Sequence, residues 1–233
     1  MLRTENLCAG YKKLQVLFEV SVTVPANLLT VVVGPNGSGK STLLKTVFGL
    51  TKVYSGRIRL DGVDITGLAP HQVASHGVAY VPQLDNVFAN LTVYENLLIS
   101  SYGLGKADSS VLDVMEIFPH LKRYQTKKAA LMSGGERQML AIAMALIRKP
   151  KIMLFDEPTG NLSPKMSTTI LNIIRDLRDS HRKTILLAEQ NAKRALEIGD
   201  KAILLVSGRT AFEGDAQTLL RHKELGRLYL GIR

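Results

Sequence analysis

The stretch that most constrains this chain runs from Gly34 to Thr42, where the sequence fits the phosphate-loop pattern Gly-x-x-x-x-Gly-Lys-Ser/Thr at every fixed position. A β-branched run precedes it and a helical pattern follows it. Glycines let backbone N–H groups converge on an anion, and the start of the helix adds further unpaired N–H groups. A glycine-rich turn without a ligand is the alternative, but strand, loop and helix all agree with the motif. The stretch therefore predicts a site for nucleotide phosphates, made of Gly34, Pro35, Asn36, Gly37, Ser38, Gly39, Lys40, Ser41 and Thr42.

Side chains in and after this loop suggest chemistry on the phosphates. Lys40 adds a mobile positive charge for the β- and γ-phosphates, and the Ser41 hydroxyl is placed to bind Mg²⁺. Further along, an apolar run at residues 152–155 ends in Asp156 and Glu157. An aspartate there can hold Mg²⁺ through its water shell, and the neighbouring glutamate can direct a water toward the γ-phosphate. Two acids at a strand end are common by themselves, but together with the loop they predict a nucleotide-hydrolysing site.

Apolar runs indicate an α/β fold with a mostly parallel core sheet. Four such runs end in polar residues, at residues 31–33, 78–81, 152–155 and 185–188. Continuous apolar strands are typical of a sheet covered on both faces, and ligands of such sheets bind beyond the carboxyl ends of the strands. Alternation over residues 18–24 and a hairpin pattern at residues 58–65 predict a separate antiparallel β layer, and a late hairpin is expected at residues 202–212.

Helical patterns dominate between the second and third apolar runs. Thr92 and Glu95 form a capping box before an apolar stretch, and residues 110–118 read as another helix. We therefore expect one domain, with its core and β layer in residues 1–86 and 150–233 and an inserted helical subdomain at about residues 87–149. Ser163 is expected to open a further helix, and Asp215 to cap a short last one.

Composition narrows the class of protein. Of the 233 residues, 45% are hydrophobic and 21% are charged, a globular balance that argues against disorder. The formal charge of +10 would suit nucleic acid or an anionic membrane surface, but the basic residues are scattered. The single cysteine, Cys8, excludes an intrachain disulfide, and no apolar run is long enough to cross a bilayer. Because no signal-peptide pattern is present either, we expect a cytoplasmic location and no nucleic-acid partner.

Three other sites are ambiguous from their residues alone. Gln83 directly follows a predicted strand and could reach metal and water, or it could be an ordinary exposed loop residue. Tyr11 could stack on a base, although a plain surface or core tyrosine fits nearly as well. Ser133 and Glu136 form a capping box, and the two glycines between them add bare N–H groups that could bind a second phosphate.

These motifs together resemble the ATP-binding subunits of ABC transporters, over essentially the whole chain. The Ser-Gly-Gly-Glu sequence that starts at Ser133 lies 23 residues before Asp156, as in that family's signature. The resemblance implies the P-loop NTPase fold of an ABC cassette, with ATP and Mg²⁺ as ligands. It also implies that two cassettes pack head to tail, as a homodimer or a heterodimer, and that each signature closes over the ATP held by the other copy.

The resemblance assigns roles to individual residues. Tyr11 would stack on the adenine ring, and Gln83 would lie in a loop that touches both the metal and the membrane subunit. Hydrolysis would depend on Lys40, Glu157 and Gln190. The signature residues acting on the partner's ATP would be Ser133, Gly134 and Gly135, and the metal ligands would be Ser41, Gln83 and Asp156.

Two departures from the usual pattern narrow the resemblance. Most members have a switch histidine where this chain has Gln190, and Pro164 stands where an aspartate is common. With the ending Leu228-Tyr229-Leu230-Gly231, these features resemble one of the two ATP-binding subunits of branched-chain amino-acid importers. That likeness implies a separate integral-membrane permease and a peripheral position on the cytoplasmic face of the inner membrane. Gln190 can donate a hydrogen bond to the γ-phosphate but cannot become a cation.

Two alternatives stay open at this point. One is an ABC ATPase for another cargo, such as a lipid or lipopolysaccharide exporter, because cargo choice belongs to the membrane and binding subunits. The other is a nucleic-acid-associated ATPase, which the charge of +10 would suit. DNA-repair members of the family carry long coiled-coil or zinc insertions, and translation factors usually carry two cassettes, so this alternative is disfavoured.

Overall fold

A six-stranded, mostly parallel sheet forms the centre of the molecule. The computed structural model describes residues 1–84, 86–103 and 107–222. The strand order is β10-β9-β3-β8-β7-β6, and only β10 is antiparallel to its neighbour. This confirms the predicted parallel sheet and the late hairpin. The strands are β3 (Leu29–Val33), β6 (Val78–Val81), β7 (Ile152–Asp156), β8 (Thr184–Ala188), β9 (Lys201–Val206) and β10 (Arg209–Asp215).

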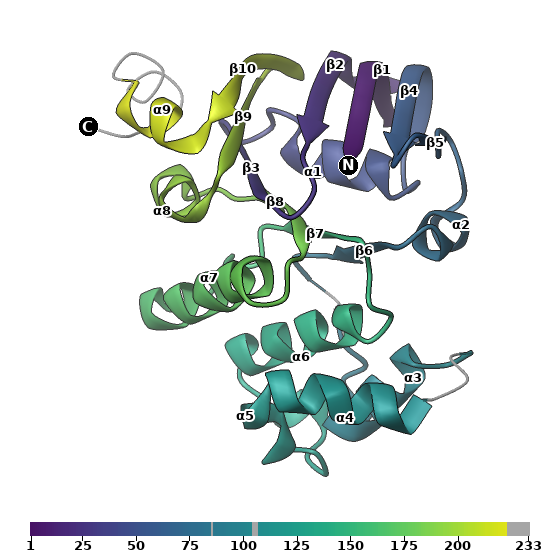
Figure 1. Cartoon of the computed structure of the whole chain (residues 1–233), viewed down its shortest axis with the longest axis vertical. Helices are drawn as coiled ribbons and strands as arrows, with labels where there is room; N and C mark the ends of the chain where they lie inside the picture. The colour runs from purple at the N-terminus through teal and green to yellow at the C-terminus, as the bar shows by residue number, and fades with distance from the viewer. Residues whose placement is uncertain (85, 104–106, 223–233) are drawn as a thin grey trace.

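A second, antiparallel sheet has the order β2-β1-β4-β5 and lies at one end of the molecule (Figure 1). In its hairpin between β4 and β5, Leu60 pairs with Val63 across the turn, as the sequence predicts. On β2, Val20, Val22 and Val24 are buried as expected, but Phe18 is only half-buried and Leu17 is buried in its place, because a left-handed φ of 55° at Glu19 interrupts the alternation. The four strands are β1 (Leu2–Tyr11), β2 (Leu14–Val24), β4 (Lys52–Leu60) and β5 (Val63–Asp64).

Both faces of the central sheet are covered, which explains its continuous apolar strands. On β3, Val32 belongs to a core shared with α1 (Lys40–Val47) and the antiparallel sheet, whereas Val31 and Val33 belong to a second core shared with helices that follow β6 in the chain. β7 alternates in the same way, because Leu154 lies in the first core and Phe155 in the second. Figure 1 shows α1 between the two sheets, and the helices between residues 93 and 179 on the other side of the central sheet.

The helices between β6 and β7 gather at the far end of the molecule (Figure 1). The predicted capping box opens α3, where the Thr92 side chain accepts a hydrogen bond from the Glu95 N–H. The helix predicted from residue 110 begins earlier, at Ala107, so that predicted boundary was wrong by three residues. The helices and the single 3₁₀ turn of this region are α3 (Val93–Ser100), α4 (Ala107–Ile117), α5 (Pro119–Lys122), η1 (Ala129–Leu131) and α6 (Gly134–Leu146).

The remaining helices flank the sheet. Ser163 caps α7 and Asp215 caps α9, as predicted. The ending at residues 228–231 lies outside the described residues. Along the described chain, no helix is both long and apolar enough to cross a membrane. These helices are α2 (Pro70–Ser75), α7 (Pro164–Asp179), α8 (Ala192–Ile198) and α9 (Ala216–Arg221).

Candidate functional site

The phosphate loop leaves β3 at Gly34 and enters α1 at Lys40. Gly34 has a positive φ of 151°, and a Cβ there would overlap the Leu205 carbonyl oxygen of β9. Only glycine therefore lets the loop pass so close to the neighbouring strand. The loop is also tied down at Ser38, whose N–H donates to the Pro35 carbonyl at 3.1 Å and whose carbonyl accepts the Gly208 N–H at 3.0 Å. Its backbone is thus held in place by contacts on both sides.

Lys40 is a buried cation within this loop, with only 4% of its side chain exposed. Its Nζ donates hydrogen bonds to the Gly34 carbonyl at 3.1 Å and to the Pro35 carbonyl at 3.2 Å. Glu157 Oε1 lies 3.9 Å from the same nitrogen. The ammonium therefore sits between the loop and the acidic end of β7, where a phosphate group could replace the two carbonyls as its acceptor.

Asp156 presents a free carboxylate oxygen at the end of β7. Its Oδ2 accepts a 2.8 Å hydrogen bond from the hydroxyl of Tyr80, whose ring stacks on Phe48. Burial and the neighbouring carboxylate raise the pKa of Tyr80, so the hydroxyl remains a donor. Oδ1 is buried and lacks a hydrogen-bond partner among the described residues. A hard oxygen donor left over in this way suits Mg²⁺, so the site fits the predicted cation.

Glu157 follows in a tight turn that aims its side chain toward the loop. Glu157 has a left-handed φ of 46°. Two hydrogen bonds hold the turn: the Glu157 N–H donates to the Ala188 carbonyl at 2.9 Å, and the Gly160 N–H donates to the Glu157 carbonyl at 3.0 Å. Gln83 Nε2 lies 3.5 Å from Glu157 Oε2. A Cβ at Gly160 would come within 2.6 Å of that same nitrogen, so this glycine makes room for Gln83.

An open cleft of about 500 Å³ brings Lys40 and Glu157 together, whereas Asp156 is not among its lining residues. Gln83 and Gln190 are exposed at its edge, and Val16 of β2, which the sequence analysis did not single out, forms part of its wall. Tyr11 does not line this cleft and is 41% exposed at the end of β1. The lining residues are Val16, Asn36, Gly37, Gly39, Lys40, Ser41, Thr42, Gln83, Glu157 and Gln190.

Ser133, Gly134 and Gly135 lie elsewhere, at the start of α6, and none of them lines the cleft. Ser133 and Glu136 form the predicted capping box, and the hydrogen bond from the Ser133 N–H lowers the pKa of Glu136. Gly134 is exposed. Gly135 is buried, and a Cβ there would overlap the Met166 side chain of α7. The second glycine therefore has a packing reason that the sequence did not reveal.

Glu189 is a buried residue of the site whose role the sequence analysis did not recognise. It follows β8 and is 3% exposed. Its Oε1 accepts the Thr159 N–H at 3.1 Å, and its Oε2 accepts the N–H of Gln190 at 3.2 Å. Burial raises the pKa of this carboxyl, and the two N–H donors oppose that rise. The only sequence signal was an acidic residue at the end of an apolar strand.

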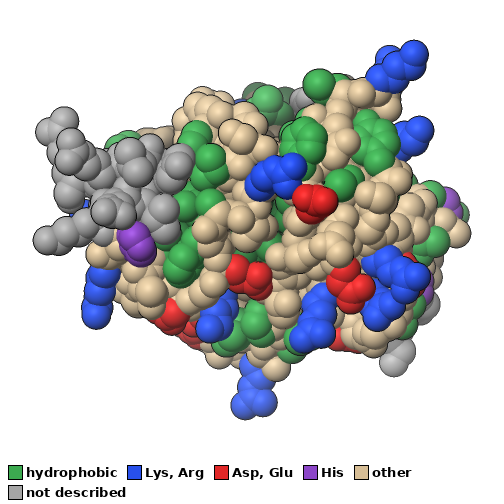
Figure 2. All heavy atoms as spheres, turned by 90° about the horizontal axis from the view of Figure 1, so that it is seen from above, with side chains coloured by type: hydrophobic (Ala, Val, Ile, Leu, Met, Phe, Trp, Pro, Cys, Tyr) green, Lys and Arg blue, Asp and Glu red, His purple; other side chains and the backbone are tan. Residues whose placement is uncertain are grey.

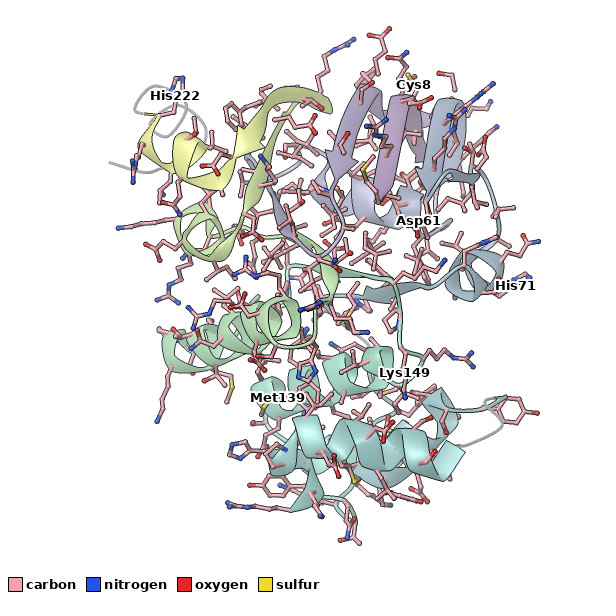
Figure 3. All side chains as sticks on the ribbon, in the orientation of Figure 1. Cys8, Asp61, His71, Met139, Lys149 and His222 are labelled. Carbon is pink, nitrogen blue, oxygen red and sulfur yellow. The ribbon has the colours of Figure 1, made fainter. Side chains whose placement is uncertain are left out.

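The described residues contain no group of three or more His, Cys, Asp or Glu side chains that could hold a metal ion by themselves. Figure 3 shows Cys8 and His71 on separate elements, with His222 near the described C-terminal end. A divalent cation at the cleft would therefore need oxygen donors of the bound nucleotide in addition to Asp156. This is the usual arrangement for Mg²⁺ in nucleotide sites.

The sequence profile of the ABC transporter family matches residues 17–160, more than half of the chain. The chain belongs to the ABC transporter family. It is therefore an ATPase subunit of that family, and its fold is the ABC cassette. A solved ABC cassette described as a dimeric post-hydrolysis state bound to ADP and Pi is 26% identical, covers 93% of this chain and 99% of its own, and has a TM-score of 0.80.

Curated relatives extend over the full length of this ABC subunit. One, named a probable branched-chain amino acid transport ATP-binding protein, LivF, comes from Archaeoglobus fulgidus; it is 53% identical and covers 100% of this chain and 99% of its own length. Another is the high-affinity branched-chain amino acid transport ATP-binding protein BraG of Pseudomonas aeruginosa. It is 40% identical, and the match covers 99% of this chain and 100% of BraG. A lipopolysaccharide export system ATP-binding protein, LptB of Haemophilus influenzae, is 34% identical, and the match covers 99% of this chain and 97% of LptB.

Proposed function

We propose that this ABC subunit binds ATP in the cleft under the phosphate loop and hydrolyses it there. The observation that carries the proposal is that four separate segments bring Lys40, Gln83, Glu157 and Gln190 to one cleft. Lys40 would bind the β- and γ-phosphates, and Glu157 would orient and deprotonate the attacking water. Gln190 would donate a hydrogen bond to the γ-phosphate without carrying a charge.

The Mg²⁺ ion would be held by Ser41, Gln83 and Asp156. Support comes from the free Oδ1 of Asp156 and from the exposure of Gln83 at the edge of the cleft. When bound, the cation would neutralise charge on the phosphate oxygens. The hydrogen bond from Tyr80 to Oδ2 keeps Asp156 in one orientation, with its other oxygen directed away from that contact.

A second ABC subunit would complete the site. Within one chain, Ser133, Gly134 and Gly135 stay outside the cleft, and the first two are exposed, as a surface that acts on another copy's ATP requires. The dimeric relative bound to ADP and Pi supports such a pair. Tyr11, exposed at the end of β1, would stack on the adenine ring in this arrangement. The partner would be either a second copy or a paralogue.

The transported cargo would be branched-chain amino acids, moved by a separate integral-membrane permease. The names of the two more similar relatives support this choice over lipopolysaccharide export. The helices in residues 87–149 would form the subdomain that, with the Gln83 loop, meets the permease on the cytoplasmic face of the inner membrane. On the face seen in Figure 2, basic and acidic side chains are interspersed, which argues against a nucleic-acid surface there.

The hydrolytic role is tested with Glu157→Gln. The amide cannot accept the water's proton, so the variant should bind ATP, accumulate as a closed dimer and lose nearly all hydrolysis. Size-exclusion chromatography with MgATP and a phosphate-release assay measure the two effects. Glu197→Gln, an exposed change on α8, is the matched control. Full hydrolysis by Glu157→Gln would refute the assignment.

The cargo is tested by purifying the chain with its membrane partners and reconstituting them in vesicles. ATP-dependent uptake of leucine or isoleucine, and an associated solute-binding protein that binds them, is the expected result. Movement of lipid or lipopolysaccharide instead would overturn the cargo assignment while leaving the ATPase role intact. Salt-sensitive binding to DNA or RNA at physiological ionic strength would favour the nucleic-acid alternative.

A further inference from the structure

Glu189 is an unusual residue to find inside a protein. Together with Asp156 it is one of two carboxylates that the described part of the chain buries. Among those residues no lysine, arginine or histidine lies within ion-pair distance of it, and its carboxylate accepts the N–H groups of Thr159 and Gln190. A buried charge is a costly way merely to fill space, because a neutral side chain of the same size would avoid desolvation.

The two partners of Glu189 belong to the loops that carry the proposed reactive groups. Thr159 lies two residues after Glu157, and Gln190 lines the ATP cleft. One carboxylate therefore connects the loop after β7 to the loop after β8, at 3.1 Å and 3.2 Å. The Glu157 turn is also bonded to β8 through the Ala188 carbonyl at 2.9 Å. The turn is thus attached to the end of β8 at both of its sides.

Glu189 also has a fixed position relative to the phosphate loop. Its own N–H donates to the Val32 carbonyl of β3 at 3.2 Å, two residues before Gly34. β8 lies between β3 and β7 in the sheet. The Glu189 side chain therefore extends from a backbone anchored beside the phosphate loop to the turn that aims Glu157 at Lys40. Short hydrogen bonds therefore connect Glu189 both to the strand that leads into the phosphate loop and to the Glu157 turn.

We infer that Glu189 is a positioning residue for ATP hydrolysis, which holds the Glu157 turn and Gln190 in register with the phosphate loop. Glu189 does not line the cleft proposed for ATP, so it would act through Glu157. This inference rests on the proposed role of Glu157. Loss of the Glu189 carboxylate should misplace the water-orienting group while leaving the phosphate-binding loop, and hence nucleotide affinity, intact.

The test compares Glu189→Gln and Glu189→Asp with the parent in the assembled transporter. Glu189→Gln keeps the shape but turns an NH₂ group toward one of the two N–H donors, and Glu189→Asp keeps the charge but is too short to reach both. Each should lower kcat about tenfold or more and change KM by less than about twofold. The control is Glu213→Gln, which removes a carboxylate that accepts the Thr23 N–H at 2.8 Å, away from the cleft.

Every outcome decides the question. A folded Glu189→Gln protein with parental kcat, or one whose KM rises while kcat holds, overturns the inference. If Glu189→Gln does not fold, the kcat and KM of the Glu189→Asp protein are compared with those of the parent in the same way. If neither variant folds, Glu189 has only a structural role and the inference is overturned. Glu157→Gln is measured in parallel. If it still hydrolyses ATP, the proposed role of Glu157 fails; if only the Glu189 variants behave like the parent, that role stands and the positioning inference fails.

Discussion

Replacing Lys40 with alanine should weaken nucleotide binding more than any other single change in the phosphate loop. The Lys40 ammonium is 4% exposed and is already desolvated. It donates to the Gly34 and Pro35 carbonyls at 3.1 and 3.2 Å. When ATP binds, these neutral acceptors can be exchanged for anionic phosphate oxygens without moving the ammonium far, so the interaction with ATP is strengthened by preorganisation.

The size of the effect follows from these contacts. A hydrogen bond to a charged group contributes about 1.5–3 kcal/mol net. Two such bonds from Lys40 to phosphate correspond to about 3–6 kcal/mol, and the two carbonyl contacts given up offset about 1–3 kcal/mol of this, which leaves about 2–3 kcal/mol. Because 1.4 kcal/mol is a factor of ten in affinity, the Kd for MgATP should rise by about 30- to 100-fold.

The assay is titration calorimetry of the purified chain with MgATP and with MgADP. Lys45→Ala provides the control, because Lys45 lies on the same helix but does not line the cleft. It should bind within about threefold of the parent. The loss of affinity caused by Lys40→Ala should be larger for MgATP than for MgADP, since Lys40 is expected to contact the γ-phosphate. If Lys40→Ala held MgATP as tightly as the parent, the reasoning about the phosphate loop would be wrong from its foundation.

Three further predictions concern the start of α6 and the proposed metal site. Gly135→Ala should lower stability by about 1–3 kcal/mol in thermal unfolding, because its Cβ would overlap a side chain of α7, whereas Gly134→Ala, whose nearest neighbour is 3.4 Å away, should be tolerated. Asp156→Asn should raise the Mg²⁺ concentration for half-maximal hydrolysis by about tenfold, and an unchanged value would exclude it as a ligand. The hydrogen bond from the Ser133 N–H lowers the pKa of Glu136 below its ordinary value of 4.5. The carboxylate therefore stabilises the folded state above pH 4.5, and this stabilisation is lost as the pH falls through the lower pKa of the folded state. Glu136→Gln should therefore lower Tm at neutral pH more than in acid, and an equal drop at both would contradict this.

Much of the fold could be predicted because local sequence carries it. Apolar continuity identified the parallel strands, and the alternation of Val20, Val22 and Val24 identified a strand with one buried face. Capping boxes located two helix starts correctly, at Thr92 and Ser133. These features depend on residues that are neighbours or at most a few positions apart, so a single stretch of chain contains the whole signal.

The start of α4 and the packing at Gly135 could not be predicted in the same way. α4 begins at Ala107, three residues before its predicted start at residue 110, because a helix start without a clear capping residue leaves no local mark in the sequence. The demand for glycine at position 135 comes from Met166, which lies on another helix 31 residues further along the chain. A side chain that approaches from elsewhere leaves no trace in the local pattern.

The candidate site likewise has some features that the local sequence predicts and others that depend on the tertiary structure. By itself, the sequence determined that a phosphate loop exists, that acids follow a buried strand, and that Gln83 and Gln190 end two others, since each is a contiguous motif. Only the tertiary structure decided that β8 lies between β3 and β7. That order lets Glu189 accept the Thr159 N–H beside the Glu157 turn, and the pairing of β6 with β7 lets Asp156 accept a hydrogen bond from Tyr80, 76 residues away in the chain. Strand order is chosen by how whole layers pack, and no short stretch of sequence contains that information.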